Sequence, residues 1–451
     1  MNVLLANPRS TNAFEAFGFV FPPLGLLYVA ATAEQAGHRI TIEDFCVSGN
    51  KPSSFEFGKY DIVGITTDTR RFRSALDIAG RARAQGCIVV MGGPHPGFAD
   101  EEILLSEYAD YVVRGEGEKT FPSLLDAISR GRVCDVAGIS YLENGCIVRT
   151  SSPPLIEDLD SLPFPARHLV DMEVYKSKGL KYGGKRPVAV ISSSRGCPYN
   201  CSFCITPQMY GKRWRARSAA SVVAEMEEVY HKYGYRAFAF CDDNFTVSPQ
   251  RVKDICGLVL EKSLDIWWWC LSSPNALLKN EDMVRLMAKA GVKTVYIGIE
   301  SANPETLKEF NKGITQDVPY KAVELLRRNG IEAFGSYILG GLNDTVAATF
   351  KTIRFSRMLD TAVAQFTILT PYPGTQLFEQ IEPLLRHKKW HLYDGVHLVF
   401  RHKNIPFVPM ELMLIWAYTS FYARGLRAVR NFFRALTRNA PLLKKFFGKA
   451  E

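Results

Sequence analysis

Residues 195–204 read Arg195-Gly196-Cys197-Pro198-Tyr199-Asn200-Cys201-Ser202-Phe203-Cys204, which places three of the chain's ten cysteines within eight positions. Three thiolates on one short loop repel one another unless they are protonated or metal-bound, and thiolates are soft ligands that favour iron–sulfur clusters or zinc. Structural zinc usually needs a fourth nearby ligand, and the first histidine after the triad, His231, lies beyond an expected helix. A 4Fe–4S cluster held by three cysteines would leave one iron open. The spacing therefore favours such a cluster, with zinc as the alternative.

The triad opens a series of strand and helix patterns. A strand expected at Val188–Ser192 stands directly before it, and apolar runs then alternate with segments of helical spacing. The further strands are expected at Ala237–Phe240, Trp267–Leu271, Thr294–Ile299, Ala333–Leu339 and Ala364–Leu369. The helices are expected at Ala219–Tyr230, Val252–Lys262, Asn280–Ala290, Val318–Asn329 and Thr345–Leu359. These repeats predict a partial (β/α)6 barrel whose chemistry gathers at the carboxyl ends of its strands.

The first 130 residues carry a shorter alternation of the same kind. Strands are expected at Val3–Leu5, Arg39–Ile42, Asp61–Ile65, Cys87–Met91 and Tyr111–Val113. Helices are expected at Leu24–Gln35, Phe72–Gln85, Glu101–Tyr108 and Lys119–Ser129. The pattern predicts an α/β domain with a parallel sheet covered on both faces. Ligands of such sheets bind at the carboxyl ends of the strands, where this chain has glycine-rich or polar loops at 7–10, 66–69, 92–97 and 114–118.

A hairpin and a linker separate the two alternating regions. Gly138–Leu142 and Cys146–Arg149 flank Glu143-Asn144-Gly145, a sequence that accepts the positive φ of a tight turn. Ser151–Pro165 contains four prolines. We therefore divide the chain into a first domain at 1–135, a hairpin and linker at 136–182, a barrel at 183–382 and a helical basic region at 383–451.

Length and composition set broad limits. The chain has 451 residues, of which 47% are hydrophobic and 22% charged, which excludes a mainly disordered protein and suggests two or three domains. No run of about 18 uncharged apolar residues is present, so no membrane-spanning helix is expected. The apolar N-terminal run is too short for a secretory signal. We expect a reducing, cytoplasmic location, which suits an oxygen-sensitive thiolate site.

The end of the chain is strongly basic. Residues 415–451 contain eight Lys or Arg and the single acid Glu451, which accounts for +7 of the chain's net +9, and aromatic residues lie between the charges. Such a segment can lie on an anionic membrane surface, which would place the protein peripherally at the inner face of the cell membrane. Packing against the barrel is an alternative. Nucleic-acid binding is a third reading and is less favoured.

The triad resembles the signature of the radical S-adenosylmethionine (SAM) superfamily, Cys-x3-Cys-x-aromatic-Cys, in which Cys197, Cys201 and Cys204 would hold a 4Fe–4S cluster. The resemblance implies that the open iron binds SAM and that electron transfer yields a 5′-deoxyadenosyl radical. It also implies SAM contacts near the ends of the barrel strands. The candidates are Phe203, Asp242, Asp243, Ser272, Glu300, Ser301, Ile338 and Gly340.

The first domain resembles the flavodoxin-like, Rossmann-type cobalamin (B12) domain of one branch of that superfamily, the branch of the anaerobic Mg-protoporphyrin ester cyclase and the hopanoid-modifying enzymes. The expected cobalamin contacts are Pro23, Gly25, Thr66, Thr67, Gly92, Gly93, His95, Gly115 and Glu116. The Asp-x-His-x-x-Gly motif of many cobalamin proteins is absent from the first loop, so we expect methylcobalamin without a protein histidine ligand. A hydrogen-bonding role for His95, helix N-terminal charges at Glu116 and Glu118, and a ligand-free regulatory domain remain alternatives.

The resemblance implies a cobalamin-dependent radical enzyme that methylates an unactivated carbon of a hydrophobic substrate, such as a lipid or tetrapyrrole. An external donor such as flavodoxin or ferredoxin would supply electrons. Oxidative cyclisation or ring rearrangement is the alternative reaction. A cluster- or cobalamin-based sensor is the alternative of another class. We expect no catalytic side-chain acid or base, because the cofactors carry the difficult chemistry.

Overall fold

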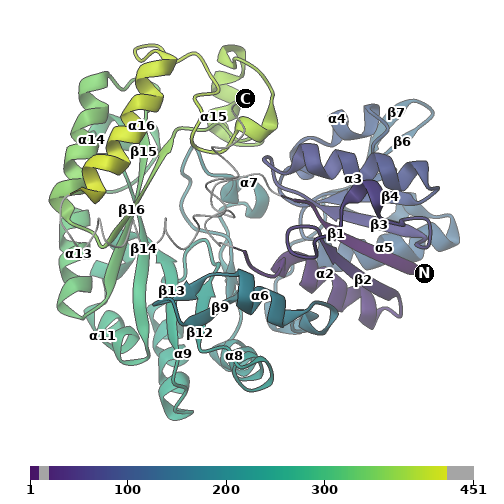
Figure 1. Ribbon diagram of the computed structural model, residues 1–451, viewed down its shortest axis with the longest axis horizontal. Helices are drawn as coiled ribbons and strands as arrows, with labels where there is room; N and C mark the ends of the chain where they lie inside the picture. The colour runs from purple at the N-terminus through teal and green to yellow at the C-terminus, as the bar shows by residue number, and fades with distance from the viewer. Residues whose placement is uncertain (10–19, 424–451) are drawn as a thin grey trace.

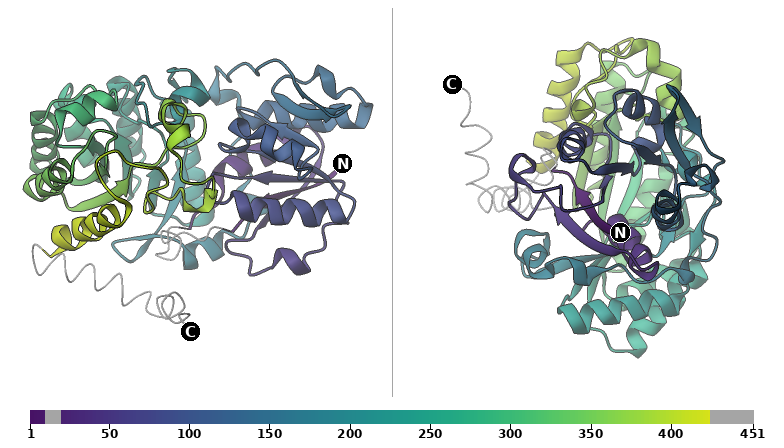
Figure 2. Two further views of the ribbon diagram at one scale, coloured as in Figure 1. Left: turned by 90° about the horizontal axis from the view of Figure 1, so that it is seen from above. Right: turned by 90° about the vertical axis from the view of Figure 1, so that its right-hand side faces the viewer.

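Two largely parallel sheets organise the chain, one in an N-terminal unit and one in a C-terminal unit (Figure 1). The computed structural model describes residues 1–9 and 20–423. Each sheet has seven strands within these described ranges. The two units lie side by side along the long axis of the molecule, as Figure 2 shows from two further directions.

The N-terminal sheet has the strand order β2-β1-β3-β4-β5-β6-β7. Its strands are β1 (Asn2–Asn7), β2 (Arg39–Asp44), β3 (Ile62–Thr66), β4 (Ile88–Gly92), β5 (Tyr111–Val113), β6 (Ile139–Glu143) and β7 (Cys146–Arg149). Successive side chains of β1 enter different cores. Val3 and Leu5 pack with α2 (Leu24–Gln35) and α5 (Gly117–Arg130), whereas Leu4 and Ala6 pack with α3 (Phe72–Ala84) and α4 (Asp100–Leu105). This two-sided burial explains why the central strands β1, β3 and β4 are largely apolar.

The hairpin of β6 and β7 belongs to this sheet, which moves the boundary of the first domain beyond residue 135. β6 pairs antiparallel with β5, with Tyr111 opposite Tyr141 and Val113 opposite Ile139. β7 then pairs with β6 through the Asn144-Gly145 turn, in which both residues have positive φ. The hairpin completes the sheet because β5 would otherwise expose its backbone hydrogen-bonding groups.

The C-terminal sheet is a half-barrel with the order β16-β15-β14-β13-β12-β9-β8. Its parallel strands are β9 (Arg186–Ile191), β12 (Ala237–Phe240), β13 (Trp267–Ser272), β14 (Val292–Glu300), β15 (Glu332–Leu339) and β16 (Val363–Ile368), and β8 (Lys181–Tyr182) pairs antiparallel with β9. The helices between them are α8 (Ala219–Tyr233), α9 (Pro249–Glu261), α10 (Pro274–Leu278), α11 (Glu281–Lys289), α12 (Pro304–Glu309), α13 (Asp317–Arg328) and α14 (Val346–Leu359). The α/β class and the partial barrel are thereby confirmed.

Short elements connect the two units and the barrel motifs. They are α6 (Met172–Lys178), β10 (Ser194–Arg195), α7 (Thr206–Tyr210), β11 (Arg215–Ala216) and α15 (Gln376–Ile381). The cysteine triad lies on the loop between β10 and α7, and α7 lies between the two units in Figure 1. The fold therefore carries the triad to the boundary between the units.

The last described helix, α16 (Phe407–Tyr422), packs on β16 and α14. The hydroxyl of Tyr418 donates to the carbonyl of Phe366 at 2.9 Å and accepts from its amide at 3.2 Å. Tyr422 makes the same pair of bonds with Ala364, at 3.0 and 3.2 Å. These hydroxyls satisfy edge groups of β16 that have no neighbouring strand. Residues 424–451, which carry all the basic charges of the tail, lie outside the described residues.

Within residues 1–9 and 20–423, no helix is both long and apolar enough to cross a bilayer.

Candidate cofactor site between the two units

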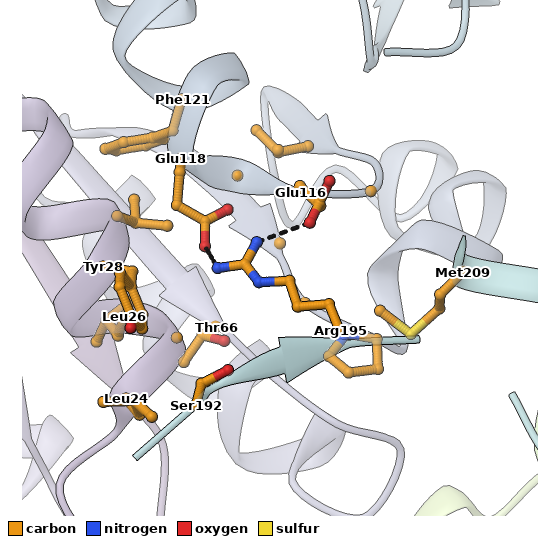
Figure 3. Close-up of a pocket in the computed structure, with 18 of the residues that line it drawn as sticks. Leu24, Leu26, Tyr28, Thr66, Glu116, Glu118, Phe121, Ser192, Arg195 and Met209 are labelled. Atoms are coloured by element: carbon orange, nitrogen blue, oxygen red, sulfur yellow. Dashed lines mark hydrogen bonds and ion pairs between the residues drawn. The ribbon is translucent and has the colours of Figure 1, made fainter. Parts of the chain in front are cut away.

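A cavity of 470 Å³ lies between the two units and is lined by residues of both. The N-terminal unit contributes an apolar and glycine-rich wall from α2 and from the ends of β3, β4 and β5. These residues include Leu24, Gly25, Leu26, Tyr28, Gly64, Ile65, Thr66, Val90, Gly92, Gly93, Val113, Gly115, Gly117 and Phe121. The barrel contributes Ser192, Ser194, Arg195, Ile205, Thr206, Met209, Tyr210, Cys241 and Asp243. Figure 3 shows Arg195 extending into this space from β10.

Six of the nine residues predicted to contact cobalamin line the cavity: Gly25, Thr66, Gly92, Gly93, Gly115 and Glu116. A Cβ added at Gly25 would meet no atom within 4 Å, so this glycine opens onto free space. Gly93 has φ +107°, and a Cβ there would lie 2.7 Å from the carbonyl oxygen of Thr67. The wall thus includes backbone conformations that favour glycine, at Gly93 and at Gly115 with φ +76°, and it has apolar side chains beside them. This lining fits a large, mostly apolar cofactor that approaches the strand ends closely.

Pro23, Thr67 and His95 do not line the cavity. His95 is 1% exposed and lies between Phe72 and Trp390, with ring centroids 4.3 and 5.2 Å away. Its Nδ1 is 3.2 Å from the Thr69 hydroxyl, and its Nε2 has no hydrogen-bond partner among the described residues. Burial lowers the pKa of His95 to about 4. The neutral ring thus joins the two units, which fits the structural alternative better than contact with a cofactor.

Glu116 takes part in a buried ion network that crosses the boundary. Its carboxylate accepts from Arg195 at 2.7 Å, from Arg215 at 2.8 and 3.1 Å, and from the amide of Ile156 at 2.8 Å. Arg195 also donates to Glu118 at 2.5 Å, and both pairs with Arg195 are drawn in Figure 3. Burial alone would raise the pKa of Glu116, but the hydrogen bonds from Arg215 and Ile156 and the charge of Arg195 outweigh it and hold this pKa below its ordinary value.

Arg195, Arg215 and Tyr210 were not predicted as site residues. Arg195 and Arg215 lie on the paired strands β10 and β11, opposite each other in register. The guanidinium of Arg195 lies 5.6 Å from the ring centroid of Tyr28, and that of Arg215 lies 5.5 Å from that of Tyr210. The only available signal was that Arg195 immediately precedes the Gly196-Cys197 pair. Sequence does not reveal that β11 would return beside it.

The triad loop is fixed at several backbone positions. The amide of Ser202 donates to the carbonyl of Phe310 at 3.1 Å, and the ring of Phe203 packs against that of Phe310 with centroids 5.1 Å apart. All three cysteines are half-buried and free of disulfides. Burial raises the pKa of Cys201 to about 11, and it also raises the pKa of Cys197 and Cys204. A metal must therefore displace protons from these thiols, and nearby positive charge assists this.

Lys312 supplies such a charge. Its ammonium lies 2.8 Å from Glu300, and the side chains of the pair are 15% and 8% exposed. Burial alone would lower the pKa of Lys312, but the charges of Glu300 and Cys201 outweigh it and raise this pKa. A Cβ at Gly298 would lie 2.5 Å from the Glu300 carboxylate and 2.8 Å from the Lys312 ammonium, so the glycine makes room for the pair. Lys312 was missed because it lies twelve residues beyond Glu300, past α12.

Asp242 and Asp243 have different environments. Asp242 is buried and accepts from the amide and hydroxyl of Ser193 at 2.8 and 2.6 Å and from the Ser194 hydroxyl at 2.5 Å. It holds the segment that leads to the triad. Asp243 lines the cavity and accepts from the amide of Gly196 at 3.1 Å and the hydroxyl of Thr206 at 2.8 Å. Burial raises the pKa of Asp243. Of the eight residues predicted to bind SAM, only Asp243 lines the cavity.

Three of the other predicted SAM residues have structural partners. Ser272 shares a hydrogen bond with Thr246, and the Ser301 hydroxyl lies 3.2 Å from that of Thr352. Gly340 has φ +77°, and a Cβ there would lie 2.2 Å from the methyl carbon of Met410 in α16. Ile338 is 9% exposed near the end of β15. Packing thus accounts for several of these positions, although their strands end on one side of the barrel sheet.

The donor set fits an iron–sulfur cluster. No group of three His, Cys, Asp or Glu side chains in the described ranges is arranged to hold a single metal ion. In a cube, each thiolate binds a different iron, so the three sulfurs need not converge on one point. The three free cysteines lie on one loop, and Lys312 lies close enough to influence their ionisation. These residues could hold a 4Fe–4S cluster. No histidine lines the cavity among the described residues.

Two family models match the chain: the B12 binding domain over residues 13–125 and the Radical SAM superfamily over residues 191–355. An uncharacterized methyltransferase of Pyrococcus horikoshii, PH0819, is 37% identical over 96% of this chain and 95% of its own. The bacteriochlorophyllide d C-12(1)-methyltransferase of Chlorobaculum tepidum is 32% identical over 89% of this chain and 83% of its own.

A solved structure shows the same architecture. The cobalamin-dependent SAM radical enzyme OxsB, with aqua-cobalamin and SAM bound, superposes with a TM-score of 0.77 over 97% of this chain and 71% of its own, at 16% identity. That likeness shows the fold, and the relatives and family models show the descent. The cofactors of the family are a 4Fe–4S cluster, SAM and cobalamin. The chain belongs to the radical SAM superfamily, in the branch of enzymes that carry an N-terminal B12-binding domain.

Proposed function

We propose that this protein methylates an unactivated carbon of a hydrophobic, tetrapyrrole-like substrate. The observation that carries the proposal is the cavity, because its glycine-rich wall from the B12 domain meets the barrel within two residues of Cys197. One cavity therefore lies beside both predicted cofactor sites. The bacteriochlorophyllide methyltransferase relative supports the substrate class, because a tetrapyrrole is broad, flat and largely apolar.

Different residues would hold the cofactors, orient SAM and exclude water. Cys197, Cys201 and Cys204 would hold the cluster, and the ends of β3, β4 and β5 would hold cobalamin. When bound, these groups and SAM supply reductive cleavage of SAM and delivery of a methyl group. Lys312 and Glu300 would orient the charged amino-acid part of SAM, because they place a buried cation and a buried anion beside the triad. The apolar cavity wall would exclude water from the reaction.

The proposal is tested by anaerobic incubation of the reconstituted, reduced protein with methyl-labelled SAM and a bacteriochlorophyllide. We expect 5′-deoxyadenosine together with labelled, methylated pigment. The Cys201→Ala variant should form neither product, whereas Cys134→Ala, which changes an exposed cysteine away from the cavity, should retain both. Failure of the wild type to form 5′-deoxyadenosine above the level of Cys201→Ala would favour the sensor hypothesis.

Oxidative cyclisation of the same class of substrate is the second candidate, carried by the resemblance to the Mg-protoporphyrin ester cyclase branch. The label separates the two reactions. Methylation transfers the labelled carbon to the pigment, whereas cyclisation changes the pigment without label. Unlabelled, oxidised pigment would overturn methylation and leave the SAM-cleaving enzyme intact.

Two partners complete the proposal. Reductive cleavage needs one electron at a time, so we include an external donor of the flavodoxin or ferredoxin type. We also include peripheral contact with an anionic membrane, because the tail carries +7 of the net +9 and the substrate class is hydrophobic. The electron donor is tested by comparing flavodoxin with a chemical reductant in the same assay. The membrane contact is tested by vesicle binding.

A further inference from the structure

The outward face of α16 is apolar and has no partner in the described structure. Val408, Leu412, Ile415 and Trp416 are 61%, 59%, 59% and 52% exposed. Their spacing of four, three and one residues places them on one side of the helix. The opposite side is buried against the barrel through Met410, Met413, Leu414, Ala417 and Phe421. Single exposed apolar residues are ordinary, but four together on one helix face indicate a contact surface.

The charges around this face are basic. Arg401 and Lys403 are exposed directly before α16, and the guanidinium of Arg386 lies 4.7 Å from the ring centroid of Phe407 in its first turn. From residue 401 to residue 423 the only acid is Glu411, which is half-buried. The basic tail begins at Arg424, immediately after the helix. An apolar row bordered by cations, with a tryptophan at one end, is complementary to an anionic lipid surface.

The position of α16 leaves the face accessible. Figures 1 and 2 show α16 on the outside of the barrel, beside α14 and away from the N-terminal unit. The tyrosine hydroxyls of Tyr418 and Tyr422 hold its inner side to the edge of β16. The helix is thus fixed by one side while the other is presented outward. Contact with lipid would require no rearrangement of the barrel.

We propose that the outward face of α16, formed by Val408, Leu412, Ile415 and Trp416, is the surface through which the protein docks on an anionic lipid bilayer. The apolar row enters the interface, and the exposed basic residues directly before the helix, Arg401 and Lys403, bind lipid phosphates. This inference deepens the membrane part of the proposed function by naming the contact surface. It corrects the sequence expectation in one respect, because Tyr418, Phe421 and Tyr422 pack on the barrel and are not available to lipid.

The test uses the full chain and vesicles of phosphatidylcholine and phosphatidylglycerol in equal parts, with vesicles of phosphatidylcholine alone for comparison. We expect co-sedimentation with the mixed vesicles that weakens as salt rises. The affinity of Leu412→Gln/Trp416→Gln for the mixed vesicles should fall by at least about tenfold, because the double variant removes apolar area without adding charge. The matched control Leu105→Gln/Leu260→Gln changes two exposed leucines elsewhere and should bind as the wild type does.

Several outcomes would overturn the proposal. Undiminished binding of Leu412→Gln/Trp416→Gln would exclude the face, and so would a wild type that binds no vesicle or binds both kinds equally. Tighter binding after removal of residues 424–451 would mean that the face is not accessible in the full chain, which would also overturn the proposal. A wild-type dimer in gel filtration that Leu412→Gln/Trp416→Gln dissociates and the control variant does not would identify a second copy of the chain as the occupant of the face. Because vesicle binding needs no SAM cleavage, either proposal can fail while the other stands.

Discussion

Glu116 accepts hydrogen bonds from two arginines of the barrel and from a linker amide, and its side chain is only 6% exposed. Glu116→Gln would leave Arg195 and Arg215 buried beside a neutral amide, so we expect a loss of about 3 kcal/mol in unfolding free energy. The measurement is urea unfolding at neutral pH. Glu157→Gln is the matched control, because Glu157 pairs with Arg213 where both side chains are more than half exposed. The control should cost less than about 1 kcal/mol, and an equal loss in both would contradict the network.

His95 is expected to make stability depend on pH. The unfolded histidine titrates near 6.5 and the folded one near 4, so the folded protein binds fewer protons between these values. His95 therefore contributes stability that is fully present above pH 6.5 and is lost as the pH falls toward 4, by about 3 kcal/mol in total. His95→Phe keeps a ring between Phe72 and Trp390. In this variant the midpoint temperature of thermal unfolding should fall less steeply than in the wild type as the pH decreases across this range. An unchanged slope would show that other groups dominate.

At single residues, the sequence predicted chemistry better than contacts. The cysteine spacing predicts the cluster ligands through a local pattern, and the structure places all three cysteines on one loop. Glu116, predicted to contact cobalamin, lines the cavity, whereas Asp242, predicted to contact SAM, holds Ser193 and Ser194 instead. The partners of Glu116 come from distant segments. Arg215 lies ninety-nine residues from Glu116 in sequence, and no periodicity indicates that they meet. Pairings of this kind depend on how two completed sheets are placed together.

Gly340 carries a prediction about an element, because it allows α16 to approach the barrel. Gly340→Ala would place a Cβ 2.2 Å from the Met410 methyl carbon at a backbone with φ +77°. We expect displacement of α16 and a loss of at least about 2 kcal/mol, measured by thermal unfolding. Gly257→Ala in α9 is the control, because its Cβ would meet no atom within 4 Å, and it should be neutral or stabilising by up to about 1 kcal/mol. Equal effects at both sites would contradict the packing argument.

Elements with a clear period were predicted almost to the residue. The helix expected at Leu24–Gln35 and the strand expected at Ala237–Phe240 have these bounds in the structure. α16 was harder, because its inner and outer faces are both apolar and its pattern resembles the tail that follows. The hairpin at Asn144-Gly145 was recognised from its turn, but its membership of the first sheet depends on pairing with β5. The local hydrophobic pattern predicts whether a segment forms a helix or a strand. Which strands lie next to one another depends on pairing between segments that are distant in sequence.

For the whole molecule, we expect the two units to unfold as one. Besides the Glu116 network, the hydroxyl of Tyr175 donates to Asp44 at 2.6 Å, and the indole of Trp390 lies 3.2 Å from Glu102. Calorimetry of the wild type should give a single transition with equal calorimetric and van't Hoff enthalpies. The double variant Glu116→Gln/Asp44→Asn removes two carboxylates at the boundary. It should unfold in two separate calorimetric transitions, one for each unit. Two transitions in the wild type would mean that these contacts do not couple the units.

The overall architecture was predictable because each half repeats one simple unit of strand and helix. The cavity was only partly predictable. Its glycine wall was visible in the loops after β3, β4 and β5, whereas Met209, Tyr210 and Cys241 come from the barrel side. A space between two domains is defined by their docking, which depends on side chains from both.

The charges at this boundary have one more consequence. Arg195 and Arg215 face Glu116 and Glu118, so two positive groups are balanced by two negative ones with little access to water. Dissolved ions can neither reach nor screen such a balanced set, so the joint between the halves should hold as well in a concentrated brine as in a dilute buffer. Purification in strong electrolyte would then strip loosely adhering polyanions from the basic end of the chain while leaving the cofactor chamber assembled.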